Sequence, residues 1–431
     1  MRKTILTITC LLIFNINNAQ QTPGEKQTKK IIINNCFIHI GNGNTIEDGA
    51  VIFFEGKLTY VGKSVKLNDY LIDESIIIDA EGKHLYPGFI ATNSTLGLVE
   101  IDAIRSTRDL DEIGDFLPHI RTIVAYNAES KIIESVRPNG VLIAQVSPRG
   151  GIISGKSSIV QLDAWNWEDA IIKLDEGIHL NWPSPYTRNY RESRIRKNNN
   201  YSKLISSIND FFNKSKVSTS ETQLNLPYEA MKGIYNGSET VYLHANYEKQ
   251  IVDGVSFLKE KKIKNIVLVH GEETENQIDF LKKHKIPVII SKPHRLPMDE
   301  DQDPNYPYKL AKKLIDGGLL LSIDLSGSME RTNTRNLPFF AGSFVAHGVD
   351  KEEALKLITL NAAKILKIDQ KIGSIEVGKS ATLFLSDGDA LDMRTNNISH
   401  AYIDGRKISL ETHQTELWDR YSKKYKKQKS E

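Results

Sequence analysis

The sequence predicts an α/β fold, in which a (β/α)8 TIM barrel carries a small composite β-sandwich built from both ends of the chain. Three observations lead to this prediction. Short apolar segments alternate with amphipathic helical patterns through the middle of the chain. Strand-like, turn-rich sequence stands near the beginning and returns near the end. The 431 residues are also enough for a barrel and a second unit.

The two outer regions have the sequence pattern that is typical of antiparallel sheets. Residues 30–85 contain β-branched and aromatic runs such as KIIINNCFIHI and GAVIFFEGKLTYVG, separated by Gly, Asn and Asp turns. Residues 366–412 repeat the pattern in GSIEVGKSATLFLSDGD and HAYIDGRKISL. Neither region has enough strands to be stable alone. We therefore expect 30–85 and 366–412 to form one composite β-sandwich.

The middle region, residues 86–365, is predicted to form the barrel. Its strand candidates are wholly apolar: GVLIAQVSP, ETVYLHA, KNIVLVHG, KIPVIIS and GLLLSIDLSG. Helical patterns such as YEKQIVDGVSFLKEKKI stand between several of them. Continuous apolar strands alternating with helices favour a parallel sheet covered on both faces, which fits a barrel and leaves a doubly wound open sheet as the alternative. The helices between residues 94 and 240 are poorly marked.

The N-terminus has the pattern of a signal peptide over residues 1–19. A basic MRK precedes the apolar ILTITCLLIF, and small and polar residues follow. The apolar run is too short to span a bilayer, so we expect a periplasmic or secreted protein without stable membrane insertion. Cleavage would remove Cys10 and leave Cys36 alone, which excludes an intramolecular disulfide and a cysteine-based zinc site.

The overall charge argues against nucleic acid as a partner. Lys and Arg number 56 against 54 Asp and Glu, a formal net charge of +2. The basic C-terminal tail, residues 413–431, is expected to be a solvated surface. A small-molecule or short-peptide substrate is the expected ligand. A homo-oligomer or a partner subunit stays open.

Three predicted strands end in side chains that can bind a metal or transfer a proton. His244 ends the strand in TVYLHA, His270 ends IVLVH, and Asp324 ends LLLSID. All strands of a parallel barrel end at the same mouth, so these side chains should converge. Neutral imidazole suits zinc, and a nearby carboxylate can take a proton from water activated by the metal. The pattern predicts one divalent metal, zinc in the first instance, held by His244 and His270, with Asp324 as the catalytic base.

The segments around these strands resemble the amidohydrolase superfamily, specifically its imidazolonepropionase-like branch. The resemblance rests on VIFFEGKLTYVG and IIIDAEGKHLYPGFI near the start, and on LITLNAAKIL, IGSIEVGKSATLFLSDGD and AYIDGRKI near the end. It implies a metal-dependent hydrolase barrel acting on amide-type C–N bonds. By position His244 and His270 match the metal-binding histidines of strands five and six. Asp324 matches the aspartate of strand eight.

The chain departs from that family on strand one. The family places an Asp-x-His-x-His pattern there, whereas this chain has Ala91, Asn93 and Thr95. Both histidines and the preceding aspartate are missing. A site with two metals sharing ligands is therefore not expected.

Two interpretations remain open. In the first, one metal is bound by His244, His270 and a third group, and the protein is an exported amidohydrolase. Asp163 is the preferred third ligand, and the alternatives are Glu168, Asp169, Lys156 and Lys173. In the second, the barrel has lost its metal and is a catalytically inactive binding or partner subunit. In either case Arg149, which stands beside two glycines, could bind a substrate carboxylate, because its planar guanidinium matches the two carboxylate oxygens.

Overall fold

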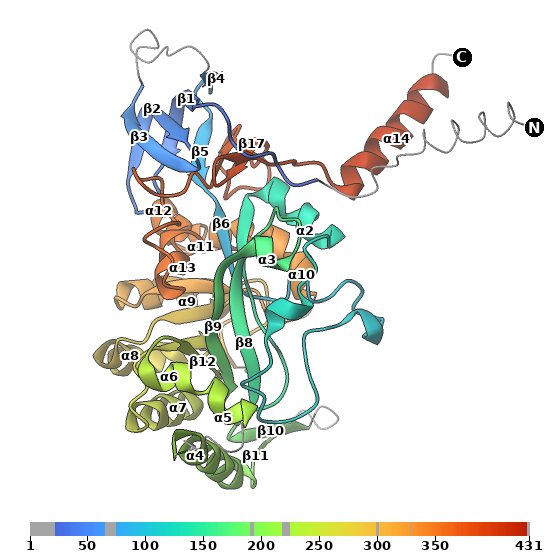
Figure 1. The fold of residues 1–431 in the computed structure, drawn as a ribbon. Coiled ribbons are helices and arrows are strands. Elements are labelled where there is room, and N and C mark those ends of the chain that lie inside the picture. The colour runs from blue at the N-terminus through green and yellow to red at the C-terminus, as the bar shows by residue number, and fades with distance from the viewer. Residues whose placement is uncertain are drawn as a thin grey trace, which may run out of the picture.

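The computed structural model of the chain describes residues 22–64, 75–189, 194–217, 225–298, 301–327 and 329–428 (Figure 1). The predicted signal peptide lies outside these residues and stays a prediction. Among the described residues, none of the helices combines the length and the apolar character that crossing a bilayer requires.

One sheet joins the two ends of the chain. Its strands follow the order β18-β17-β16-β5-β1-β2-β3, and β4 pairs with β1. The strands are β1 Ile31–His39, β2 Thr45–Phe54, β3 Lys57–Lys63, β4 Ile76–Asp79, β5 His84–Pro87, β16 Leu383–Ser386, β17 Ile398–Ile403 and β18 Arg406–Lys407. The seam between the two ends is the antiparallel pair β5–β16. These pairings give a single eight-stranded sheet, so the packing of two sheets into a sandwich stays a prediction.

This sheet has a core of its own, formed by apolar side chains from both ends of the chain. Ile33 and Phe53 come from the N-terminal strands, and Leu385 and Tyr402 come from the C-terminal ones. All four are essentially inaccessible to solvent. Burial on this scale contributes about 1.5–3 kcal/mol per large apolar side chain, which explains why the two ends associate.

The central region closes into an eight-stranded barrel beside this sheet (Figure 1). The strands follow one another around it as β6-β7-β8-β9-β12-β13-β14-β15. Their bounds are β6 Phe89–Ser94, β7 Val141–Val146, β8 Ile153–Gln161, β9 Ile171–Asn181, β12 Thr240–Ala245, β13 Ile266–His270, β14 Val288–Ser291 and β15 Leu321–Asp324. The predicted eight-stranded barrel is thus present, with β15 pairing parallel to β6 to close it.

One strand of the barrel corrects the prediction of eight repeated βα units. β8 runs antiparallel to both β7 and β9, and no helix connects β7 to β8. The turn between them contains Gly150 and Gly151, with φ values of 80° and 59°. Glycine adopts this left-handed conformation at little cost, so the chain reverses at once where a βα unit would insert a helix. Residues that follow β8 consequently lie at the end of the barrel opposite to the mouth.

Helices cover the outside of the barrel on the side of the later strands (Figure 1). The α-helices are α2 Lys131–Val136, α3 Trp167–Ala170, α4 Tyr201–Val217, α5 Leu226–Ala230, α6 Lys232–Asn236, α7 Glu248–Glu260, α8 Ile278–His284, α9 Tyr306–Asp316, α10 Glu330–Asn333, α11 Leu337–Val345, α12 Lys351–Lys356, α13 Leu360–Ile365 and α14 His413–Gln428. Short 3-10 helices are η2 Arg105–Thr107, η3 Thr122–Ala125, η4 Arg137–Asn139, η5 Thr274–Gln277 and η6 Thr334–Asn336. A hairpin, β10 Tyr186–Asn189 and β11 Arg194–Lys197, follows β9.

The barrel interior contains a buried carboxyl group, Glu176 of β9. It accepts hydrogen bonds from Gln145 (2.7 Å), Ser157 (2.6 Å) and Tyr242 (2.7 Å). Burial raises the pKa of Glu176, against the opposing effect of these donors. Since a buried polar group without partners is costly, the three donors explain how the interior tolerates this acid.

A pH-dependent stability follows from this carboxyl group. Because the pKa of Glu176 is raised in the folded state, its contribution is fully present below the ordinary value of 4.5 and is lost as the pH rises through the folded pKa. Glu176→Gln should remove this decline. Urea unfolding between pH 4.5 and 8 should show a flatter profile of the free energy of unfolding for Glu176→Gln than for wild type. The exposed Glu168→Gln is the control, and equal slopes in all three proteins would contradict the assignment.

Candidate active site at the barrel mouth

The structure brings His244, His270 and Asp324 together at the mouth, where β12, β13 and β15 end. His244 Nδ1 lies 3.1 Å from His270 Nε2. His270 Nδ1 lies 2.8 Å from Asp324 Oδ2. The three side chains form a row, in which each contacts the next.

The row has a fourth member that the sequence analysis did not identify. His179 of β9 lies with its Nδ1 2.8 Å from His244 Nε2. It is completely buried and stacks on the ring of Tyr242. In the sequence it stands inside an extended segment and is followed by Leu180 and Asn181, so it lacked the strand-end position that marked the other two histidines.

Burial determines the protonation of the inner rings. It lowers the pKa of both His179 and His244 well below the ordinary value, so these rings are neutral at physiological pH. The carboxylate of Asp324 can only accept, so His270 donates to it through Nδ1–H. His179 Nε2 is buried and has no hydrogen-bond partner among the described residues.

Asp324 is held by donors on both oxygens. Its Oδ1 accepts from Asn93 Nδ2 (2.8 Å) and from the backbone N–H of Ser326 (3.0 Å). Its Oδ2 accepts from the Ser326 hydroxyl (2.6 Å) and faces His270. Burial would raise the pKa of Asp324, but His270 and the Ser326 donors outweigh it and hold that pKa well below its usual range. The group is therefore an ionised carboxylate.

Two residues of the site have backbone conformations that side chains rarely adopt. His270 has a φ of 75° and Asn93 a φ of 49°, both in the left-handed region. This region costs a residue other than glycine about 1–2 kcal/mol, although Asn tolerates it better than most. Such strain is concentrated at functional sites, where the surrounding contacts fix a side chain in one direction.

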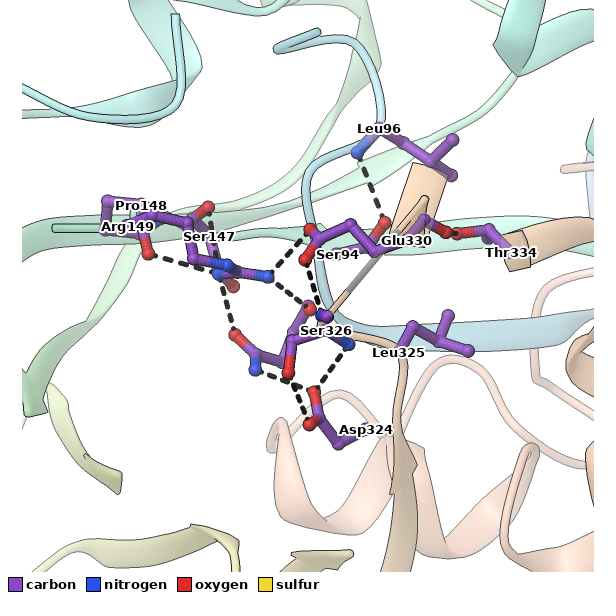
Figure 2. A network of polar contacts seen from close by, with 12 residues as sticks. Ser94, Leu96, Ser147, Pro148, Arg149, Asp324, Leu325, Ser326, Glu330 and Thr334 are labelled. Atoms are coloured by element: carbon purple, nitrogen blue, oxygen red, sulfur yellow. Dashed lines mark hydrogen bonds and ion pairs between the residues drawn. The ribbon is translucent and has the colours of Figure 1, made fainter. Parts of the chain in front are cut away.

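The amide of Asn93 on β6 stands at the position where the family has its first histidine, and the guanidinium of Arg149 reaches it from the turn between β7 and β8. The Asn93 side-chain oxygen accepts from Arg149 (3.0 Å), and its backbone carbonyl accepts from the same guanidinium (2.8 Å). Arg149 also forms an ion pair with Glu330 at 2.9 Å. Figure 2 shows Arg149 reaching toward Glu330, with Asp324 and Ser326 beside them. A fixed cation thus stands next to strand one, which opposes a metal ion there.

The environment of Arg149 differs from the predicted one. We predicted that its fork would face a substrate carboxylate. The guanidinium lines the cavity at the mouth, but its donors are taken by Asn93, Glu330 and the carbonyls of Ser147 and Pro148. Its charge is balanced by Glu330, so little of it is left for a ligand.

Asp163, the preferred third metal ligand, is not in the site, and this prediction is wrong in its placement. Because β8 is antiparallel, Asp163 follows the strand at the far end of the barrel. Both of its oxygens are occupied there, by Arg137 at 2.6 Å and by Arg406 at 3.1 Å. It is a buried structural anion that joins the barrel to the sheet strand β18.

The other candidates for the third ligand also lie elsewhere. Glu168 and Asp169 are exposed residues of the short helix α3. Lys156 forms an ion pair with Glu239 at 2.5 Å. Lys173 donates to the carbonyl of Leu366 at 3.0 Å. The side chain adjoining the two histidines is His179.

A cavity of about 660 Å³ opens over this row. Its polar floor includes His244, His270 and Asn93. Further lining residues are Thr95, Val99, Asp102, Arg108, Leu110, Arg149, Asn181, Ser326, Gly327, Met329, Glu330 and Arg331. A second cavity of about 550 Å³ meets the first at His270 and Ser326. Volumes of this size suit a small organic molecule.

The row supplies donors of the right chemistry for a metal ion. Neutral imidazoles and an ionised carboxylate are ligands that zinc prefers, and the buried His179 Nε2 has no partner in the described part of the chain. Within the described ranges, no group of three or more His, Cys, Asp or Glu side chains converges on a single point. The imidazoles are bonded to each other in series. Binding an ion here means exchanging those mutual hydrogen bonds for ligand bonds.

Comparisons with known proteins agree with this architecture. Residues 313–408 match the model of the amidohydrolase family. An imidazolonepropionase of Syntrophobacter fumaroxidans is 33% identical over 82 residues, 19% of either chain. The chain thus spans about a fifth of the length of the curated relatives it matches. An amidohydrolase from Thermotoga maritima shares the fold with a TM-score of 0.74 and 23% identity, covering 88% of this chain and 99% of its own.

A zinc-bound adenosine deaminase of Xanthomonas campestris is a more distant neighbour. Its TM-score is 0.54 at 14% identity, and the comparison covers 94% of this chain and 99% of the other. The C-terminal part of the chain matches the amidohydrolase family, and the predicted resemblance to the imidazolonepropionase-like branch of that superfamily is confirmed. Members of this superfamily are typically metal-dependent, but the comparisons do not identify a metal for this chain.

Proposed function

We propose that the barrel mouth is the active site of an exported amidohydrolase, which hydrolyses an amide-type C–N bond in a small molecule or a short peptide. The observation that carries the proposal is the row His179–His244–His270–Asp324 beneath a cavity of substrate size. The match of residues 313–408 to the amidohydrolase family supports the reaction class. Since a fold hosts many activities, the weight rests on the site itself.

The imidazoles of His179, His244 and His270 would hold one divalent ion, with zinc the first candidate. When bound there, such an ion would polarise the substrate carbonyl and lower the pKa of the attacking water. His179 replaces Asp163 as the third ligand in this proposal. Three protein ligands with one open position are the usual composition of a catalytic zinc site.

Asp324 would accept the proton of the attacking water. It is ionised and buried, and Ser326 lines the cavity above it. The Ser326 hydroxyl is the donor at Oδ2 that a water can replace from the cavity side. Asn93 and the backbone of Ser326 keep Oδ1 in place, so the free lone pair would be directed at the water. The departing amine would then receive this proton, which regenerates the carboxylate.

A metal-free binding protein is the second candidate. The hydrogen bonds from Arg149 to Asn93 favour this candidate, because they hold a guanidinium beside the first barrel strand, where the family has a metal-binding histidine. Such a protein would bind the same small molecules without cleaving them. His244, His270 and Asp324 would then have a structural role.

A hydrolysis screen separates the two candidates. The mature chain is assayed against N-acyl amino acids, dipeptides and cyclic ureides, first as purified, then after chelation, and then after adding back zinc or manganese. Hydrolysis that chelation abolishes, that metal restores and that His270→Ala lacks would support the proposal. Binding of the same compounds without turnover under all three conditions would favour the binding protein.

A further inference from the structure

The last helix of the chain, α14, carries an exposed aromatic face. It begins against α2, where the N–H of His413 donates to Glu134 Oε1 at 2.7 Å. From there it extends away from the body of the molecule (Figure 1). Trp418, Tyr421 and Tyr425 stand three and four positions apart, so they share one face of the helix. Their exposed fractions are 73%, 48% and 57%.

This exposure leaves α14 without the packing that usually stabilises a helix. A helix of 16 residues is marginal by itself in water, and most helices in proteins are stabilised by burying an apolar face. A single exposed aromatic ring is ordinary, whereas a row of three on one face marks a surface that binds something.

The far half of α14 is strongly basic. From position 420 to position 429 the sequence has one arginine, five lysines and no acidic residue. Arg420, Lys423 and Lys426 recur every three positions on the side of the helix away from the rings. Other cations border the aromatic face, since the Lys424 Nζ lies 5.7 Å from the centre of the Tyr425 ring. The helix thus combines an aromatic face with a cationic one.

An anionic lipid surface matches both faces. Trp and Tyr are the aromatic residues that concentrate at the boundary between membrane and water, because their rings are apolar with one polar atom. Lysines near such a surface are attracted to anionic headgroups, and their long stems can lie along the apolar boundary. A second copy of the helix fits less well, because pairing the aromatic faces would bring two basic segments together.

We propose that α14 is a membrane-docking helix, which lies along an anionic lipid surface with Trp418, Tyr421 and Tyr425 in the interface. Its basic residues would contact the headgroups, in place of the solvated tail that the sequence predicted. The helix would lie on the bilayer and not cross it, since it is short and rich in charge. This inference is independent of the proposed hydrolase activity, because no residue of α14 lines the cavity at the barrel mouth.

The test measures how the purified protein binds lipid vesicles. Co-sedimentation with vesicles of phosphatidylcholine mixed with phosphatidylglycerol is compared with pure phosphatidylcholine. The protein should bind the anionic vesicles at least about tenfold more tightly, and high salt should weaken this binding. Trp418→Ala should weaken it about tenfold, because one ring no longer enters the interface. Replacing Lys423, Lys424 and Lys426 together by Gln should weaken it about 100-fold, at about fivefold for each lysine.

Two variants of the same chemistry elsewhere on the surface are the controls. Trp165→Ala removes a tryptophan that is 62% exposed and lies outside α14. Replacing Lys203, Lys214 and Lys216 by Gln removes three exposed lysines of α4, and so changes the net charge equally. Both controls should bind anionic vesicles within about twofold of wild type.

The contrary results are distinct from these. Equal binding to neutral and anionic vesicles, no binding to either, or losses in the α14 variants no larger than in their controls would overturn the inference. Sedimentation velocity without lipid tests a second copy as the occupant of the aromatic face. A dimer that Trp418→Ala dissociates, in a protein that binds no vesicles, would assign this face to self-association and overturn the lipid assignment.

Discussion

Asp324→Asn is expected to lower kcat/KM for the best substrate of the screen by about 10²–10⁴-fold, the usual contribution of a general base. The amide preserves the volume of the side chain and can still accept from Ser326, so the fold should be unchanged. The loss should appear mainly in kcat, because the carboxylate acts on the water and not on the bound substrate. Steady-state kinetics of purified wild type and variant measure it.

Ser326→Ala is the matched control for this substitution. It removes a hydroxyl that donates to the same carboxylate but leaves the base itself in place. A loss below about tenfold is expected, in line with one hydrogen bond to a charged group. If Asp324→Asn retained activity within a few-fold of wild type while Ser326→Ala lost it, the base would have to be another group.

Asp163→Asn is expected to destabilise the protein by about 3–5 kcal/mol without affecting the metal site. The aspartate is the buried partner of Arg137, whose side chain is only 4% exposed, and of Arg406. Removing the negative charge leaves two guanidinium groups facing each other across a buried contact, which is the costly way to break a buried ion pair. Urea unfolding monitored by circular dichroism gives the difference in the free energy of unfolding.

Asp169→Asn provides the comparison, since this nearby aspartate is exposed. Its effect should stay within about 0.5 kcal/mol. The opposite pattern, a stable Asp163→Asn protein that had lost a bound metal, would restore Asp163 to the ligand role that the sequence first suggested.

The sequence predicted those strands of the barrel that are apolar along their whole length. β12, β13 and β15 are mainly apolar runs, and each has an ionisable residue at its last or next-to-last position. This is why the sequence alone predicts that His244, His270 and Asp324 lie at one mouth. The composite sheet could be predicted for a similar reason, because β-branched runs separated by turn residues, with no helical pattern between them, stand near both ends of the chain.

The antiparallel strand β8 could not be predicted in the same way. Its direction depends on the two left-handed glycines before it, and a glycine pair in a sequence marks a turn without giving the direction of the next strand. The preference for Asp163 followed from this error. A residue that ends a strand lies at the mouth only if the strand is parallel to the others.

The remaining parts of the site were hidden by sequence distance and by neutral side chains. His179 stands inside its strand and not at the end of it. Asn93 and Arg149 are 56 positions apart, and their contact depends on the β6–β7 pairing. An asparagine in place of a histidine signalled a lost ligand in the sequence. Only the three-dimensional structure shows that the guanidinium of Arg149 lies beside Asn93.

The central claim is that three imidazoles at the barrel mouth hold one metal ion, and metal analysis tests it most directly. The protein is purified without chelator and its metal content is measured by inductively coupled plasma mass spectrometry. We predict about one divalent ion per chain, as for a mononuclear catalytic site. This ion should be absent from His179→Ala and His244→Ala and retained in Asp163→Asn. A wild-type protein that carries no metal and takes up none from added zinc, or histidine variants that keep a full complement, would contradict the account.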